Sequence, residues 1–138
     1  MKKLRYINIK VGQTAEYERT ITDDDIEKFA EVSGDYNPVH MDEEYAKQTI
    51  FKGRIAHGML SASFISTVLA SKLPGPGSIY LKQDLVFRKP VRIGDKILVK
   101  VEVVSKNDEK KRLTLKTLCW NQENEIVIDG EALVMASD

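Results

Sequence analysis

The segment His57–Leu73, with the sequence HGMLSASFISTVLASKL, is the part of the chain that decides the fold. Small and apolar residues occupy nearly every side of a helix drawn through it, which predicts about four turns enclosed on most faces. The cluster Pro74–Gly77 ends this helix, because proline cannot continue it and glycine favours turns. A membrane span needs ~20 predominantly apolar residues, and the serines and threonine here favour a core helix instead.

After Pro74–Gly77 the hydrophobic period changes to that of strands. Four strands are predicted, at residues 79–88, 96–106, 112–121 and 126–136, and a short one at 16–21. Apolar and polar residues alternate along them, which predicts one buried and one wet face. A long helix followed by an antiparallel sheet that can wrap it predicts an α+β fold, in a single domain of residues 1–138.

Composition excludes several classes of partner. Lys and Arg together number 21, as do Asp and Glu, so the formal net charge is zero and argues against nucleic acid and acidic membranes as partners. The single cysteine, Cys119, cannot form an internal disulfide, and we expect it to be an inert strand residue. The stretch 1–6 carries three positive charges, but no apolar signal core follows it, so the predicted location is cytoplasmic.

Two helices are predicted before the core helix. Thr22 is a suitable N-cap with Asp25 at the third helical position, and Gly34 is placed to end this first helix in a left-handed turn. Its apolar face is predicted to carry Ile26, Phe29 and Ala30 with Val32. The acidic run 42–44 predicts a second, shorter helix.

The motif Asp35-Tyr36-Asn37-Pro38-Val39-His40 places a carboxylate and an imidazole around an Asn-Pro turn. Pro38 fixes its own φ and favours extended geometry at Asn37, so we expect the motif not to continue as helix. Histidine titrates near neutrality, so a neighbouring carboxylate makes Asp35 and His40 candidate acid/base groups. The alternative is an Asx-turn that simply reverses the chain.

Gly58 falls at the predicted start of the core helix. The first N–H groups of a helix have no helical partners, and a glycine there leaves room for a ligand oxygen. The alternative is that His57 and Gly58 merely begin the helix, with His57 as a packed or capping histidine.

Four stretches together resemble the MaoC-like, R-specific enoyl-CoA hydratases of the hot-dog fold. The resemblance runs from about Gly12 to the C-terminus, and the D-x-N-P-x-H element with a downstream His-Gly is its specific part. The matching stretches are 35–42, 51–60 ending in His-Gly-Met-Leu, 74–80, and 87–91 followed by Gly94-Asp95. The resemblance implies a long central helix wrapped by a curved antiparallel sheet.

The resemblance also implies an activity and its residues. Water is added to, or removed from, a trans-2-enoyl thioester, giving an (R)-3-hydroxyacyl thioester. Asp35 and His40 match the catalytic acid/base pair, and the N–H of Gly58 matches the donor to the thioester oxygen. Asn37 is expected to orient the turn. Which of Asp35 and His40 activates water stays open, and neither a metal nor a cofactor is expected, coenzyme A being part of the substrate.

The resemblance further implies how the substrate is held. A homodimer with two sites is expected, with the acyl chain running between protomers, and pairing of the two sheets would cover an open edge. Arg88 and Lys89 are the first candidates to bind the phosphates of coenzyme A, and Arg54 or Lys82 are secondary candidates. The alternative for each of the four is an ordinary surface cation with no role in binding.

Three further residues are assigned to the acyl chain. Ser66 matches a position that lines the site, either as a hydrogen-bonding support or as a serine bonded to its own helix. Leu69 follows Ser66 by three residues and is expected to close the acyl channel, with Val134 on the opposite wall. Short acyl chains of about four to six carbons are therefore the expected substrates.

Other activities stay open on the sequence. A 3-hydroxyacyl dehydratase acting on acyl carrier protein would use the same pair of residues. A hot-dog thioesterase and a non-catalytic acyl-CoA-binding module are the remaining alternatives. Chain length and physiological direction are not determined by these residues.

Overall fold

A computed structural model describes residues 2–136 of the chain. A 3₁₀ turn, η1 (Tyr6–Asn8), comes first. The strands are β1 (Thr14–Thr20), β2 (Ile79–Phe87), β3 (Lys96–Asn107), β4 (Arg112–Trp120) and β5 (Ile126–Met135), and the helices are α1 (Asp23–Ser33), α2 (Pro38–Met41), α3 (Glu43–Lys47) and α4 (Gly58–Ser71). The strands form one antiparallel sheet in the order β1-β3-β4-β5-β2, so β1 and β2 are its edges.

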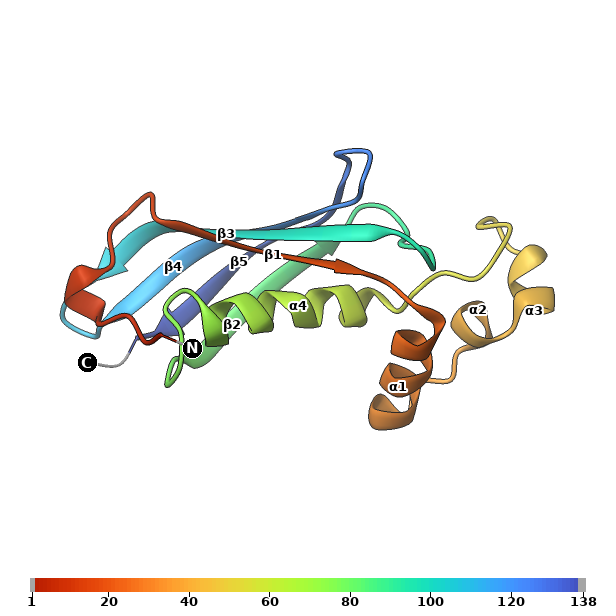
Figure 1. The fold of residues 1–138 in the computed structure, drawn as a ribbon, viewed down its shortest axis with the longest axis horizontal. Coiled ribbons are helices and arrows are strands. Elements are labelled where there is room, and N and C mark those ends of the chain that lie inside the picture. The colour runs from red at the N-terminus through yellow and green to blue at the C-terminus, as the bar shows by residue number, and fades with distance from the viewer. Residues whose placement is uncertain (1, 137–138) are drawn as a thin grey trace.

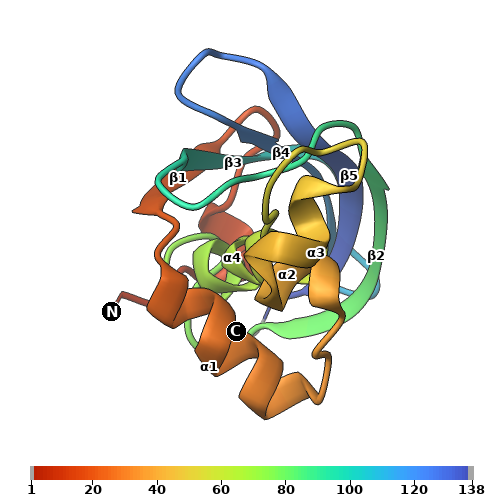
Figure 2. The same ribbon diagram turned by 90° about the vertical axis from the view of Figure 1, so that its right-hand side faces the viewer.

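The sheet curves around α4, which lies along its concave face (Figures 1 and 2). The expected α+β fold is thus confirmed, and each predicted strand lies within two residues of the observed one. Alternate residues of the central strands face the helix, and the fully buried ones include Ile97, Val99, Val101, Val103, Leu113 and Leu115. The core therefore lies between the sheet and α4.

α4 is apolar because most of its sides are covered. Seven of its residues are buried, among them Phe64, Ile65 and Val68. The helix ends at Ser71, shortly before Pro74, as the Pro/Gly cluster predicts. Within the described residues, no helix has the length and apolarity that a membrane crossing requires.

α1 has the predicted caps at both ends. The Thr22 side chain accepts a hydrogen bond from Asp25 N, Asp25 accepts one from Thr22 N, and Gly34 adopts φ 78°. The apolar face carries Ile26 and Ala30, which are fully buried. The placement of Val32 on this face was wrong, because six residues beyond Ile26 it lies on another side of the helix, where it is 83% exposed.

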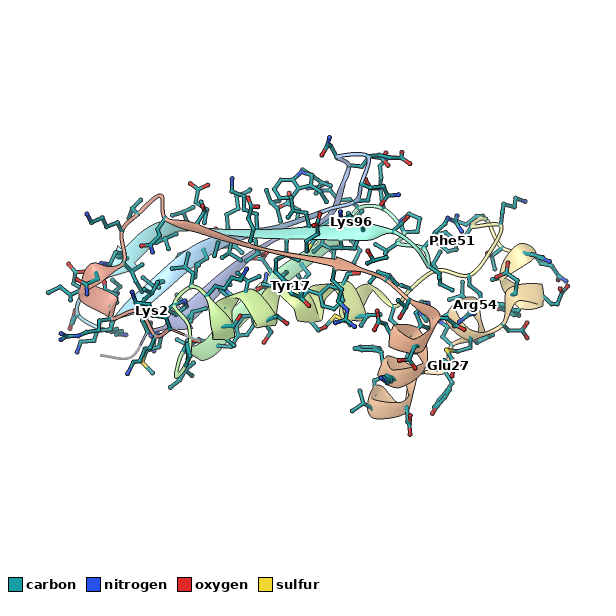
Figure 3. All side chains as sticks on the ribbon, viewed as in Figure 1. Lys2, Tyr17, Glu27, Phe51, Arg54 and Lys96 are labelled. Atoms are coloured by element: carbon teal, nitrogen blue, oxygen red, sulfur yellow. The ribbon has the colours of Figure 1, made fainter. Side chains whose placement is uncertain are left out.

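α1, α2 and α3 gather at one end of the long axis, and the described chain ends lie at the other (Figure 1). In Figure 3, Phe51 and Arg54 lie at the helical end, whereas Lys2 lies at the opposite end. The helical end is where the start of α4 meets the Asp35–His40 motif, and the candidate site lies there.

Candidate active site

The Asp35–His40 motif forms a tight corner between α1 and α2. Asp35 Oδ1 accepts a hydrogen bond from Asn37 N (3.1 Å), and Asn37 Oδ1 accepts one from Val39 N (3.3 Å). Asn37 is thereby the N-cap of α2, and Pro38 is its first residue. The motif does not continue the preceding helix, as predicted, since α1 ends at Ser33 and Asn37 is not helical. The new short helix α2 that begins at Pro38 was not predicted; proline is well suited to the first helical position, where no N–H is needed.

His40 is half-buried, and its ring is oriented by the backbone. Its Nδ1 lies 2.8 Å from the carbonyl oxygen of Ile55, which can only accept, so Nδ1 carries the proton of the neutral ring and Nε2 is free. Burial lowers the pKa of His40, as does the nearby His57, against opposing effects of the Ile55 bond and Asp35. His40 is therefore neutral near pH 7, with Nε2 able to accept a proton.

His57 holds the motif from the other side. Its Nε2 donates to the backbone oxygen of Asp35 (2.9 Å), and its ring lies 4.1 Å from that of His40 and 4.9 Å from that of Phe29, measured between centroids. The imidazole is 2% exposed, and its Nδ1 is buried with no partner among the described residues. The alternative prediction, that His57 is a packed histidine, is confirmed in that the ring is buried. Its hydrogen bond to the backbone of Asp35 was not predicted, because the spacing of the two residues in the sequence does not indicate it.

Asp35, His40 and His57 bring possible ligand atoms within 4.8 Å of one another. Two imidazoles and a carboxylate are a donor set that suits a transition metal. Each histidine, however, uses one nitrogen to bond a backbone oxygen, so one nitrogen of each is left. The same arrangement suits a proton-transfer site that holds water.

Gly58 is the first residue of α4, as predicted, so its N–H has no partner within the helix. A Cβ at this position would lie 2.7 Å from Cε1 of Phe87. A side chain at residue 58 would therefore force the Phe87 ring to move, which favours glycine at this position. Phe87 is half exposed and lies at the end of β2.

A cavity of about 300 Å³ opens beside these groups. His40 and Gly58 line it together with Ser61, and its other walls are mainly apolar. Arg88 and Lys89, which are both exposed, also line the cavity and form its rim. The remaining lining residues are Phe51, Ile55, Ala56, Phe87, Pro90, Val91 and Ile128.

Both rim cations also pair with carboxylates. Arg88 lies 3.1 Å from Asp129, and Lys89 pairs with Glu125. Because both pairs are partly exposed, they are weak and a phosphate can compete for the cations. Arg54 differs, since its Nε donates to His40 O (2.6 Å) and its Nη2 lies 2.7 Å from Asp23 Oδ1.

The predicted acyl-chain residues do not meet in this cavity. Ser66 and Lys82 line a second cavity of about 510 Å³ between α4 and β2, with Met59, Tyr80 and Leu81 among its walls. Leu69 and Val134 are core residues, 2% and 1% exposed. Leu69 shares one stripe of α4 with residues that line the first cavity, since residues 58, 61, 65 and 69 are spaced by three or four.

A long helix wrapped by a curved antiparallel sheet is the hot-dog fold. With a carboxylate and a neutral imidazole beside a helix N-terminus, the class is a hot-dog protein equipped for acid/base chemistry. A family model described as "MaoC like domain" matches residues 7–121, and this chain belongs to that family.

Named relatives agree with this assignment. The chain is 52% identical over 128 residues to an (R)-specific enoyl-CoA hydratase of Rhodospirillum rubrum, covering 93% of this chain and 88% of the relative. It is 46% identical over 134 residues to a 3-hydroxybutyryl-CoA dehydratase of Methylorubrum extorquens, covering 97% and 85%. The unliganded R-hydratase PhaJ1 from Pseudomonas aeruginosa superposes with a TM-score of 0.94 at 49% identity, covering 99% of this chain and 87% of that one.

Proposed function

We propose that this protein is an (R)-specific enoyl-CoA hydratase, which adds water reversibly to trans-2-enoyl-CoA to give (R)-3-hydroxyacyl-CoA. The observation that carries the proposal is that the Asp35 carboxylate lies within 4.8 Å of a ring nitrogen of His40, and that His40 lines a cavity together with Gly58. The similarity to named hydratases supports the same reaction.

Hydration requires a base for water and a proton for the α-carbon. The ligand atoms of Asp35 and His40 lie within 4.8 Å, a separation that one water held by both groups can span. Neutral His40 accepts a proton through Nε2 as the water oxygen bonds to C3 of the substrate. The pair then returns one proton to C2 on the same face, so that one water is added in total.

Charge develops on the thioester oxygen during this step. The N–H of Gly58 is placed at the positive end of α4, where it stabilises a growing enolate. Asn37 contributes through position, because its side chain caps α2 and fixes the corner between the two catalytic groups.

The remaining substrate contacts are proposed from position and charge. Arg88 and Lys89 at the cavity rim would meet the phosphates of coenzyme A. Ser66 would support the substrate from the second cavity, and Leu69 with Val134 would limit the acyl chain to a short one. Coenzyme A enters as part of the substrate, and the residues named here complete the reaction with no further cofactor.

Loss of the enoyl-thioester absorbance of crotonyl-CoA tests the activity directly. The expected result is steady loss with wild type and a loss that is ~10²- to 10⁴-fold slower with Asp35→Asn. Inactivity of the wild type on crotonyl-CoA and on longer enoyl-CoA thioesters would refute the proposal. Parallel assays with carrier-protein thioesters, and of free thiol release, separate the acyl-carrier-protein dehydratase and thioesterase alternatives.

A homodimer and a cytoplasmic location are further parts of the proposal. β2 is an edge of the sheet, and an exposed apolar edge strand favours pairing with another chain. Five apolar residues of β2 are at least 39% exposed: Ile79, Tyr80, Leu81, Val86 and Phe87. The lone Cys119, which forms no internal disulfide, suits the reducing cytoplasm.

Light scattering after gel filtration tests the dimer. Leu81→Glu places a charge on the exposed face of β2 and is expected to yield monomers. Val32→Glu is the matched control, because Val32 is also exposed but lies on α1. A monomeric wild type, or equal effects of both variants, would contradict an interface at β2.

A further inference from the structure

Ser61 has a buried hydroxyl that the structure does not satisfy. The residue is 0% exposed, and its Oγ has no hydrogen-bond partner in the described part of the chain. Other serines of α4 bond to their own helix: Ser63 Oγ donates to Leu60 O and Ser71 Oγ to Thr67 O, both at 2.5 Å. Leaving a buried hydroxyl unpaired destabilises a protein, so an unpaired hydroxyl at this position indicates a partner that the chain itself does not supply.

The position of Ser61 indicates what that partner is. Ser61 lines the same cavity as His40 and Gly58. It follows Gly58 by three residues, so both lie on one face of α4, and helical side chains point back toward the N-terminus. The hydroxyl therefore lies on the side of the cavity where the Gly58 N–H is also found.

We propose that the Ser61 hydroxyl is a second hydrogen-bond donor to the thioester oxygen of the substrate, beside the Gly58 N–H. The proposal rests on the proposed hydratase function. The thioester oxygen supplies the acceptor that Ser61 lacks, and it gains negative charge as the enolate forms. The bond is stronger in the transition state than in the bound substrate, so its loss lowers kcat more than it raises KM.

His57 Nδ1 is the competing partner, because it too is buried and unpaired. Its Nε2 carries the proton given to Asp35 O, so Nδ1 can only accept. A Ser61–His57 bond would stabilise the fold without contacting the substrate, and the cavity lining includes Ser61 but not His57. The two roles predict different spectra of a bound thioester.

The test compares Ser61→Ala and Ser61→Cys with Ser71→Ala. Cysteine keeps nearly the volume of serine with a much weaker donor, and Ser71 is an exposed serine at the far end of the same helix. Kinetics use crotonyl-CoA. Difference infrared spectroscopy follows the carbonyl stretch of bound butanoyl-CoA, a saturated thioester that cannot be hydrated, labelled at its carbonyl carbon.

Ser61→Ala and Ser61→Cys are expected to lose on the order of 10²-fold in kcat/KM, mainly in kcat, as for other donors to a developing oxyanion. The carbonyl band of bound butanoyl-CoA should move to higher frequency in both variants and stay in place in Ser71→Ala. An unshifted band overturns the proposal, whether activity falls or not. If wild type binds butanoyl-CoA but hydrates no enoyl-CoA, the hydratase function fails, and the band still decides whether Ser61 contacts the thioester.

Discussion

Replacing Leu69 with alanine distinguishes a residue that closes the acyl channel from one that only fills the core. Leu69 is 2% exposed and packs in the main apolar cluster. It also lies on the stripe of α4 that carries Gly58 and Ser61, about 12 Å beyond Ser61 along the helix axis. The variant is therefore expected to alter both stability and substrate choice.

The stability change follows from burial. Leu→Ala removes three carbons, worth about 2.4 kcal/mol at ~0.8 kcal/mol each, and the residual cavity raises the cost to about 3–5 kcal/mol. With an unfolding entropy of about 2.1 cal/mol/K per residue, a 138-residue chain loses about 10–17 °C in Tm.

The change in selectivity follows from the space that is opened. Each methylene that enters it contributes up to ~0.8 kcal/mol, so two are enough to raise kcat/KM for eight-carbon relative to four-carbon enoyl-CoA about tenfold. The assay measures this ratio together with Tm.

Leu73→Ala is the matched control. Leu73 is 1% exposed but lies beyond the last residue of α4, so the same atoms are removed from the core elsewhere. Both variants should melt earlier, and only Leu69→Ala should change the chain-length ratio. An unchanged ratio in a destabilised Leu69→Ala protein would show that Leu69 is ordinary core.

Other predictions concern the proposed catalytic pair, Asp35 and His40. Asp35→Asn and His40→Ala should each lower hydration by ~10²- to 10⁴-fold with unchanged circular dichroism and oligomeric state, and retention of more than about a tenth of activity would contradict their assignment. Because burial lowers the pKa of His40, the acid limb of the kcat/KM profile should lie below pH 6.5, and an acid limb above pH 6.5 would argue against His40 as the base. The folding stability that depends on neutral His40 should be complete above pH 6.5 and should decline as the pH falls through the folded-state pKa. Chiral chromatography should give the R product, the S product being incompatible with this site. Dialysis against EDTA should leave activity unchanged, whereas a loss restored by zinc would make Asp35, His40 and His57 a metal site.

Local patterns predicted the elements because each pattern has a local physical cause. Strand period, the Thr22–Asp25 capping box and the left-handed turn at Gly34 depend on residues close in sequence, and all three are present. Val32 was misplaced because its angular position around the helix axis was not worked out. An apolar residue close in sequence to a buried face is exposed when it projects from another side of the helix.

The presence of two separate cavities beside α4 could not be predicted from the motif. Ser66 and Ser61 both lie on α4, yet Ser61 faces one cavity and Ser66 the other. A helix carries residues on all sides, and only the placement of β2 and the 87–91 segment decides which side forms which wall. The sequence does show that Ser61 follows Gly58 by three residues. Its burial and its unpaired hydroxyl depend on tertiary structure and can be seen only in the fold.

The orientation of Asp35 and His40, the proposed catalytic pair, depends on residues 54–57, to which we assign no catalytic side chain. Ile55 orients the His40 ring through a backbone oxygen, and Arg54 Nε bonds His40 O. His57 then holds the backbone oxygen of Asp35. A backbone oxygen leaves no trace in the identity of its residue, so Ile55 cannot be recognised from its side chain. The D-x-N-P-x-H motif supplies the carboxylate and the imidazole of the proposed pair, and residues 54–57 determine which nitrogen of His40 is free.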